Sequence, residues 1–355
     1  MSVVTVGETR TQARTRTGVT VIVPAYNEAE SISDTVRSLQ EQTAPPARII
    51  VVDDCSSDST GDIARDLGVE VMTPPFNTGS KAGAQNFALR TVDTEFVMAV
   101  DGDTVLAPDA IELVSGAVVG DPDVAAACGY VIPQRVRSVW ERGRYVEYLY
   151  SFAFAKQVQD FYKRPLISSG CFSLYRTETL RATGGWETRT VTEDMDLTWT
   201  FYERGKKVRF VPEAVSYPVE PTNFRLMRTQ LRRWSHGFWQ NVMLHRKELP
   251  GVPMLYSIVS VVVFDAVVAS LILIVALPLL ALLVDPLFLL GYLVDLPFIA
   301  VPVLVDARRR REFWKAFISL PSFLVLRIVN VVMMQKAFLL EVVLHRRLDV
   351  YEKGH

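Results

Sequence analysis

Cysteine is scarce in this sequence, and neither sign of charge predominates. The 355 residues include three cysteines, Cys55, Cys128 and Cys171, an odd number without the paired spacing of a metal site. This argues against a disulfide-built fold and predicts a reducing compartment. Acidic and basic residues number 39 and 38, which leaves a net charge of −1. The chain lacks the overall positive charge of a nucleic-acid-binding protein, so we expect no nucleic acid partner.

Two common phosphate-binding loops are also missing. No G-x-G-x-x-G follows the first predicted strand and no G-x-x-x-x-G-K occurs, which argues against a dinucleotide-binding fold and a P-loop enzyme. The opening segment, MSVVTVGETRTQARTRTG, has no apolar core of the kind found in signal peptides. We expect residues 1–18 to be a disordered lead-in and the region after them to stay in the cytoplasm.

Residues 19 to about 250 mix charged and apolar residues as a soluble domain does. Short β-branched runs such as GVTVIVP and ARIIVVDD alternate with segments whose apolar residues recur at helical spacing. This alternation predicts an α/β fold with a mostly parallel sheet covered by helices on both faces. Ligands of such sheets bind beyond the carboxyl ends of the strands, which is where PAYNE, DDCSSD and DGD stand.

Acidic residues gather at these predicted strand ends. The DGD motif places Asp101 and Asp103 one residue apart, and their oxygens suit Mg²⁺ or Mn²⁺ bridging a diphosphate. Asp53 or Asp54 in VVDDCSSD could accept hydrogen bonds from a base or a ribose. Ordinary alternatives stay open for both motifs: DGD could be a solvated turn, and the second motif could cap the next helix.

Two later motifs are sharper. In TEDMDLTW, Glu193 and Asp194 precede a predicted helix, where a carboxylate can act as a general base or can simply cap the helix. TQLRRWSHGFW packs arginines, a histidine and tryptophans just before an apolar tail. Two roles are open for it, a site for an anionic leaving group and a sugar ring, or an anchor to lipid headgroups through neighbouring arginines: Arg225, Arg228 and Arg232.

The motifs also occur together, in one order along the chain. PAYNE, VVDDCSSD, SKAGAQN, VDGD, SSGCFSLYR, TED and QLRRW follow one another over residues 24–234. This set resembles the inverting family 2 glycosyltransferases, and within them the membrane-embedded β-polysaccharide synthases for cellulose, hyaluronan, chitin oligosaccharide and poly-N-acetylglucosamine. TEDMDL is most similar to the poly-N-acetylglucosamine branch. The resemblance implies a GT-A-like fold and an enzyme that uses a nucleotide sugar with Mg²⁺ or Mn²⁺.

The resemblance also implies a role for each matching residue. The residues expected to hold the nucleotide sugar are Ala25, Tyr26, Glu28, Asp53 or Asp54, Lys81 and Asp101, and Asp103 is the expected metal ligand. Asp194 would be the general base beside Glu193, while the acceptor pocket would be bordered by Ser169, Gly170 and Cys171. Gln230, Arg233 and Trp234 match Q-x-x-R-W. Arg233 would pair with the diphosphate and Trp234 would form a floor under the acceptor sugar. We expect His236 and Trp239 to be structural.

The apolar tail predicts membrane insertion. Residues 254–284 and 286–305 are each long enough to span a bilayer, and the ARRRRE segment after them should stay cytoplasmic. Residues 313–343 carry a polar stripe that suits either a third span or an interfacial helix. We favour a span, although it would place Arg346 and Arg347 outside, against the charge rule. The expected organisation is a catalytic domain at 19–222, an amphipathic segment at 223–250 and about three membrane helices at 251–345.

We therefore expect a multi-pass glycosyltransferase of the inner membrane that forms a β-linked oligo- or polysaccharide. Its acceptor would be a saccharide or a lipid-linked acceptor, and the protein could form a homo-oligomer. The sequence departs from the resemblance in having no membrane helix before the catalytic domain, which weakens the expectation of a private secretion channel. One alternative is transfer of a single sugar to a polyprenyl phosphate or another lipid. Another is a non-enzymatic assembly protein on a transferase fold, although intact DGD, TED and QLRRW motifs count against it.

Overall fold

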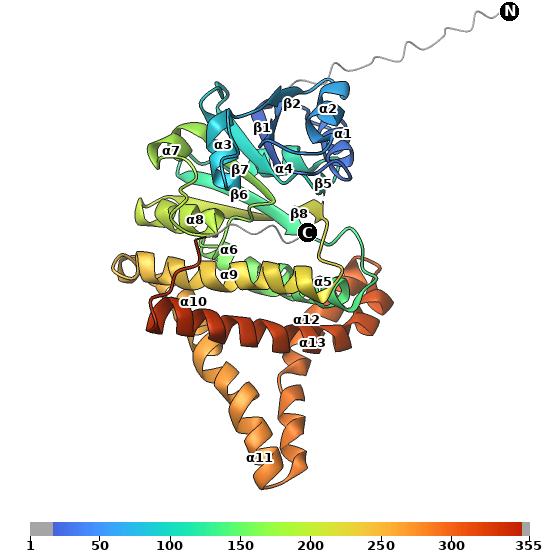
Figure 1. The fold of residues 1–355 in the computed structure, drawn as a ribbon, viewed down its shortest axis with the longest axis vertical. Coiled ribbons are helices and arrows are strands. Elements are labelled where there is room, and N and C mark those ends of the chain that lie inside the picture. The colour runs from blue at the N-terminus through green and yellow to red at the C-terminus, as the bar shows by residue number, and fades with distance from the viewer. Residues whose placement is uncertain (1–16, 350–355) are drawn as a thin grey trace, which may run out of the picture.

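The computed structural model describes residues 17–349, so nearly all of the expected lead-in at 1–18 lies outside the described residues. One eight-stranded sheet forms the upper half of the molecule in Figure 1, in the order β3-β2-β1-β4-β7-β6-β8-β5. The strands are β1 (Thr17–Ala25), β2 (Pro46–Asp53), β3 (Glu70–Met72), β4 (Phe96–Val100), β5 (Thr104–Leu106), β6 (Val124–Val131), β7 (Phe172–Arg176) and β8 (Lys207–Pro218).

The sheet is mixed rather than wholly parallel. Four neighbouring pairs are parallel, namely β1–β2, β1–β4, β2–β3 and β6–β8, and three are antiparallel, namely β4–β7, β6–β7 and β5–β8. The runs GVTVIVP and ARIIVVDD form β1 and β2, which pair in parallel as predicted. Each antiparallel pair includes β7 or β8.

Helices cover both faces of the sheet, as predicted. One face packs against α1 (Ile32–Gln40), α2 (Thr60–Asp66) and α4 (Ala110–Val119). The other face packs against α3 (Lys81–Leu89), α7 (Thr177–Ala182) and α8 (Glu193–Glu203). The central strands β4 and β6 are buried along their whole length, which explains their nearly continuous apolar sequences.

A helical layer lies below the sheet in Figure 1. It contains α5 (Val139–Tyr150), α6 (Lys156–Phe161) and the long α9 (Phe224–His245), with α13 (Phe313–Ala337) beneath α9. Helix α13 packs against both α5 and α9. The Q-x-x-R-W segment is therefore helical and lies on the lower side of the domain in Figure 1, where α13 covers it from below.

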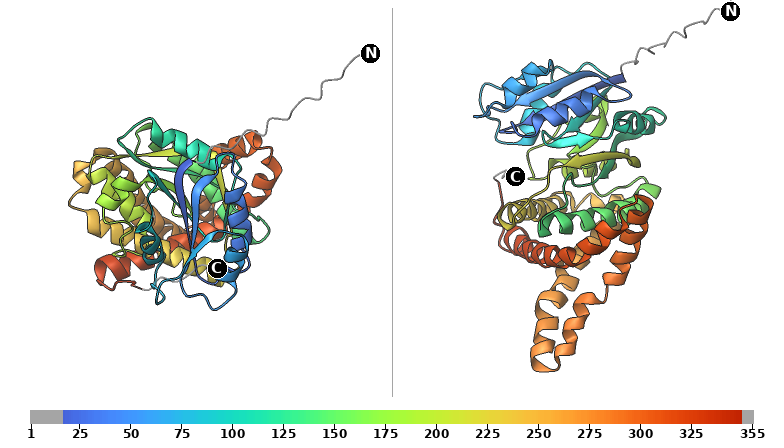
Figure 2. Two further views of the ribbon diagram at one scale, coloured as in Figure 1. Left: turned by 90° about the horizontal axis from the view of Figure 1, so that it is seen from above. Right: turned by 90° about the vertical axis from the view of Figure 1, so that its right-hand side faces the viewer.

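The first two apolar segments form a hairpin that projects away from this layer (Figures 1 and 2). The descending arm contains α10 (Pro253–Phe264) and α11 (Leu277–Leu283), and the returning arm contains η5 (Pro286–Leu293) and α12 (Leu296–Arg309). The two candidate spans, Pro253–Leu283 and Pro286–Arg309, each contain an 18-residue stretch with a mean hydropathy of 2.9 and 2.2, respectively, and only 11% of each stretch is buried within the molecule. Their exposed apolar surface suits a lipid environment.

The third apolar segment, Phe313–Val343, also has the length and hydropathy of a span, at 2.0, but it lies differently. It runs crosswise above the hairpin instead of alongside it (Figures 1 and 2). Both of its ends contact the helical layer: Tyr145 of α5 donates to Glu312 at 2.7 Å, and the His236 Nδ1 of α9 lies 2.6 Å from Glu341. This geometry favours the interfacial alternative over the third span.

Candidate functional site

Two cavities meet at the lower edge of the sheet. The first, here called the loop cavity, has a volume of about 400 Å³ and is lined by the loops that follow β1 and β2, the start of α3 and the DGD motif. The second, here called the helix cavity, has a volume of about 330 Å³ and is lined by α5, α8, α9 and the segment after β8. Lys81, Asp101 and Asp103 belong to both walls, so a molecule that fills both cavities must pass these three residues.

The DGD motif sits in a tight turn between β4 and β5. A Cβ atom on Gly102 would lie 3.0 Å from Glu28 Cγ and 3.4 Å from the carbonyl oxygen of Pro24. Glycine permits this close approach because it has no Cβ atom, and the loop after β1 therefore packs against the motif. Asp103 is buried and its carboxylate accepts a hydrogen bond from Thr104 Oγ1 at 3.2 Å.

Most residues predicted to hold a nucleotide line the loop cavity: Ala25, Tyr26, Glu28, Asp54, Lys81 and Asp101. Asp53 does not line it. The carboxylate of Asp53 accepts a hydrogen bond from Ser56 N at 3.0 Å and lies against Gly61 instead. Of the two alternatives, the structure therefore brings Asp54 to the cavity, where its carboxylate accepts bonds from the backbone and hydroxyl of Thr78, both at 2.8 Å.

The same wall includes residues that the sequence analysis missed. Cys55, Asn77 and Ser80 line the loop cavity. Asn77 donates to the carbonyl oxygen of Asp54 at 2.7 Å, and Ser80 caps α3 by accepting from Gly83 N at 3.1 Å. Ser80 stands directly before the first residue of α3, and serine is a common N-cap residue.

Lys81 links the two cavities. Its Nζ pairs with the carboxylate of Asp101, donates to the carbonyl oxygen of Gly170 at 2.9 Å and lies 3.9 Å from Glu193 Oε1. Burial raises the pKa of Glu193, against the opposing charge of Lys81. Lys81 therefore places a positive charge beside the carboxylates of Asp101 and Glu193. Such a charge suits a site where a diphosphate binds next to carboxylates.

Asp194 occupies the first turn of α8 and lines the helix cavity. Its carboxylate accepts hydrogen bonds from Gly170 N and from Met195 N, each at 2.9 Å. A Cβ atom on Gly170 would lie 2.8 Å from Asp194 Oδ2 and 3.0 Å from Lys81 Nζ, so only glycine fits there without displacement. Ser169, Gly170 and Cys171, for which the resemblance implied a place beside the acceptor, line the same cavity.

The Q-x-x-R-W residues reach the cavity from α9. Gln230, Arg233 and Trp234 fall on one helical face by their spacing, and all three line the helix cavity with Glu193 and Asp194. Glycine permits the close packing behind them, since a Cβ atom on Gly237 would lie 2.3 Å from Thr192 Oγ1. The structure thus brings TED and Q-x-x-R-W, about 40 residues apart in the chain, onto one wall.

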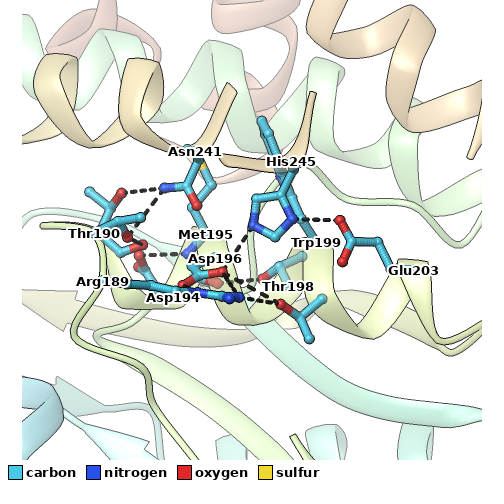
Figure 3. A network of polar contacts seen from close by, with 12 residues as sticks. Arg189, Thr190, Asp194, Met195, Asp196, Thr198, Trp199, Glu203, Asn241 and His245 are labelled. Atoms are coloured by element: carbon cyan, nitrogen blue, oxygen red, sulfur yellow. Dashed lines mark hydrogen bonds and ion pairs between the residues drawn. The ribbon is translucent and has the colours of Figure 1, made fainter. Parts of the chain in front are cut away.

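A buried polar network fastens α8 to α9 (Figure 3). His245 of α9 places its Nε2 2.9 Å from Asp196 Oδ1 and its Nδ1 2.5 Å from Glu203 Oε1, and Arg189 donates two bonds of 2.8 Å to Asp196. Although burial acts against protonation, the bonds to Asp196 and Glu203 raise the pKa of His245 to about 9. Asp196 stands two residues after Asp194, so this network fixes the start of α8 relative to α9. No sequence motif marks this network.

His236 and Trp239 have structural surroundings. His236 is buried against Glu341, as noted above, and the Trp239 indole donates to the carbonyl oxygen of Met334 at 3.2 Å. Both contacts join α9 to α13 and its continuation. Of the three arginines weighed as headgroup anchors, Arg225 and Arg228 are exposed and Arg232 is half-buried.

The shared wall offers few metal ligands. Across residues 17–349, no group of three or more His, Cys, Asp and Glu side chains is placed to hold a metal ion by itself. Asp101 and Asp103 nevertheless offer two hard oxygen donors at a cavity edge. Mg²⁺ is commonly held by one or two carboxylates together with substrate phosphates and waters, so these residues fit a metal that arrives with a diphosphate.

The sequence is similar to known glycosyltransferases. The family model described as glycosyl transferase family 2 matches residues 20–184. The poly-beta-1,6-N-acetyl-D-glucosamine synthase of Staphylococcus epidermidis is 26% identical over 244 residues, or 65% of this chain and 59% of that protein. That of Staphylococcus aureus is 25% identical over 223 residues, or 62% of this chain and 54% of that protein. The chain thus spans little more than half the length of these relatives.

Solved structures share the fold. The mannosyltransferase PcManGT from Pyrobaculum calidifontis, in complex with GDP-Man and Mn²⁺, superposes with a TM-score of 0.60 at 20% identity, covering 90% of this chain and 88% of that one. TarS 1-349 of S. aureus gives 0.50 at 17% identity, covering 86% and 90%. The matched region contains the DGD motif and every residue that lines the loop cavity, and the fold of the sheet is shared with these solved structures. Residues 20–184 of this chain therefore match the glycosyl transferase family 2 domain.

Proposed function

We propose that this protein is a membrane-bound inverting glycosyltransferase that moves a sugar from a UDP-sugar to an acceptor hydroxyl and builds a β-linked oligo- or polysaccharide. The observation that carries the proposal is the meeting of the two cavities at Lys81, Asp101 and Asp103. A nucleotide in the loop cavity would direct its diphosphate to this junction. The sugar would then enter the helix cavity, where Asp194 and Trp234 stand.

The chemistry is a single displacement. Asp194 takes the proton of the acceptor hydroxyl, whose oxygen attacks the anomeric carbon from the face opposite the diphosphate. The bond between that carbon and the diphosphate oxygen breaks, and the nucleoside diphosphate leaves with the bonding electrons. An α-linked donor thereby gives a β-linked product. The reaction needs no covalent intermediate on the protein.

The surrounding charges suit the departing group. Arg233 presents a planar guanidinium that can bind two phosphate oxygens, and Lys81 adds a second cation at the junction. Asp103, together with Asp101, would hold Mg²⁺ or Mn²⁺, and the metal when bound would supply positive charge beside the diphosphate. The mannosyltransferase with the similar fold was solved with a nucleotide sugar and Mn²⁺, which supports this part of the proposal.

The proposed membrane arrangement has two spans and one surface helix. The hairpin would cross the bilayer and α13 would lie at its cytoplasmic surface, below α9. The Arg310 guanidinium lies 3.9 Å from the Tyr130 ring centroid in β6, so the arginines at 308–311 stand on the side of the catalytic domain. With α13 at the surface, Arg346 and Arg347 stay on this same side, and the conflict with the positive-inside rule disappears.

A panel of nucleotide sugars offered to the purified protein, with and without saccharide acceptors, tests the proposal. We expect acceptor-dependent release of nucleoside diphosphate and a β-linked product of more than one sugar, detected by mass and by anomeric NMR coupling. Products limited to single-sugar lipid adducts would favour the polyprenyl-phosphate alternative. Absence of turnover with every donor, in protein that binds UDP, would favour a non-enzymatic role.

A further inference from the structure

A buried arginine stands behind the helix cavity, and none of the motifs includes it. Arg144 of α5 has a fully buried side chain. Its Cζ lies 4.5 Å from the ring centroid of Trp234 and 5.5 Å from that of Tyr148. Its Nη2 donates to Gln230 Oε1 at 2.7 Å. The arginine itself does not line the cavity, but Trp234, Tyr148 and Gln230 all do.

Two carboxylates balance this buried charge. Arg144 pairs with Glu147 of the same helix, and its Nε lies 3.4 Å from Glu220 Oε2. Glu220 is buried, lines the cavity and accepts a hydrogen bond from the Tyr148 hydroxyl at 2.7 Å. Burying a cation is costly unless it is paired, and an apolar side chain would fill the same space at lower cost. The arrangement therefore points to a role beyond packing.

The hydrogen bond to Gln230 fixes the orientation of its amide. Arginine has donors and no acceptor, so the oxygen of Gln230 must face Arg144 and the NH₂ group must point away from it. The guanidinium also lies close enough to the Trp234 ring for a cation–π contact, which restrains the plane of the indole. Arg144 thus acts at the same time on two of the three Q-x-x-R-W side chains that face the cavity.

Helix α5 is itself held firmly. A Cβ atom on Gly143 would lie 2.9 Å from the Ser322 carbonyl oxygen and 2.9 Å from Leu326 Cβ of α13. Asn330 of α13 donates to Glu147 at 3.4 Å. The arginine is therefore anchored on a helix that packs directly on α13, and a contiguous set of contacts runs from α13 to Trp234.

We propose that Arg144 is a positioning residue that sets the plane of Trp234 and the orientation of the Gln230 amide, and so determines how the acceptor sugar is held. The proposal rests on the proposed function, since it assigns the helix cavity to the acceptor. It predicts that loss of Arg144 impairs acceptor binding selectively. Nucleotide binding in the loop cavity should be preserved, because no member of the Arg144 cluster lines that cavity.

The test is a double-mutant cycle in steady-state kinetics. Arg144→Met should raise the acceptor KM by roughly tenfold, the scale of one cation–π contact plus one hydrogen bond, while the UDP Kd stays within about twofold. Arg144→Lys should give an intermediate effect because an ammonium cannot match the planar contact. In a Trp234→Ala background, Arg144→Met should add much less than in the parent, because coupled residues act non-additively.

A second variant guards against misfolding. Arg144→Met combined with Glu220→Gln removes the buried pair, and the one charge that then loses its arginine is the partly exposed carboxylate of Glu147. Glu220→Gln alone is the matched control. The combined variant should keep the parent melting temperature and UDP Kd but show the raised acceptor KM. Independent effects of Arg144→Met and Trp234→Ala, or an unchanged acceptor KM in folded protein, would overturn the proposal. A parent that binds UDP and transfers no sugar would refute the proposed function, and this inference with it.

Discussion

The loop cavity is walled by turns that follow parallel strands, whereas the helix cavity is walled by helices from distant parts of the chain. Its contributors include α5, α8, α9 and residues 218–220 at the end of β8. The sheet fixes the loop cavity directly, while the helix cavity depends on how the lower layer is packed. This difference suggests a division of labour in which the sheet binds the nucleotide and the helical layer, tied to the membrane region, selects the acceptor. Substitutions should therefore separate by cavity.

The largest loss is expected at the wall common to both cavities. Asp103→Ala should lower transfer by on the order of a thousandfold, the scale of several kcal/mol of lost metal-dependent charge stabilisation. Chelation should inactivate the parent, and added Mn²⁺ should restore it. Asp109→Ala is a suitable control because Asp109 is exposed and lines neither cavity. Full activity of the parent in excess chelator would show that the aspartates serve another purpose.

Removal of the proposed base comes next. Asp194→Asn keeps the side-chain shape and removes the proton acceptor, so transfer should fall on the order of a hundredfold or more. The UDP Kd should change little, since Asp194 lines only the helix cavity. The measurements are initial rates and UDP titration on the same preparation. Near-normal turnover would remove Asp194 from the chemistry.

A crossed pair of aromatic substitutions tests the division itself. Tyr26→Ala, in the loop cavity, should raise the UDP Kd by roughly tenfold, the scale of one lost stacking contact. Trp234→Ala, in the helix cavity, should instead raise the acceptor KM by roughly tenfold. If Trp234 were only a membrane anchor, its variant would partition less into membranes and work normally in detergent. If both substitutions changed the UDP Kd, or both changed the acceptor KM, the two cavities would not bind different substrates.

The network in Figure 3 should affect stability more than chemistry. The folded pKa of His245, about 9, lies above its usual 6.5, so protonated His245 stabilises the fold. This contribution is complete below pH 6.5 and is lost as the pH rises through 9. The melting temperature of the parent in detergent should fall across that window. The melting temperature of His245→Gln should not show the part of this decrease that comes from His245. If the melting temperatures of parent and variant depended equally on pH, the assignment would be contradicted.

The smallest expected effect on activity concerns the tail. With α13 at the surface, epitope tags at the two ends of the chain should lie on the same side of the membrane and leave transfer unchanged. Both tags should be cleaved by protease in inside-out vesicles and protected in spheroplasts. A cysteine introduced by Asp285→Cys, at the hairpin turn, should react with an impermeant maleimide only from outside. Tags found on opposite sides would restore the third span.

The sequence predicted the loop cavity better than the helix cavity, for a physical reason. Parallel strands bring their carboxyl ends to one edge, so residues next to strand ends, such as Tyr26 and Asp101, converge whatever the loops do. Within that wall the choice between Asp53 and Asp54 needed the structure. Alternation along a strand end turns adjacent side chains in opposite directions, and only the observed register shows which one faces the cavity.

The helix cavity could be predicted only where a motif was present. Asp194 and Trp234 stood out in TED and Q-x-x-R-W, whereas Tyr148, Phe152 and Glu220 belong to no motif and reach the wall through tertiary packing. The same limit applied to the tail. Hydropathy shows that residues 313–343 can span a bilayer, but the contacts of Glu312 and Glu341 with the helical layer exist only in the folded chain.

The most direct measurement is photolabelling of the protein with a 5-azido-UDP-sugar, followed by peptide mapping. The uracil carries the reactive group, so the label reports where the nucleotide base binds. We predict label on peptides of the loop cavity, at residues 24–28, 54–55 and 77–84, with competition by unlabelled UDP and little change in Trp234→Ala. Competable label on α5 or α9 instead would place the nucleotide in the helix cavity and contradict the account.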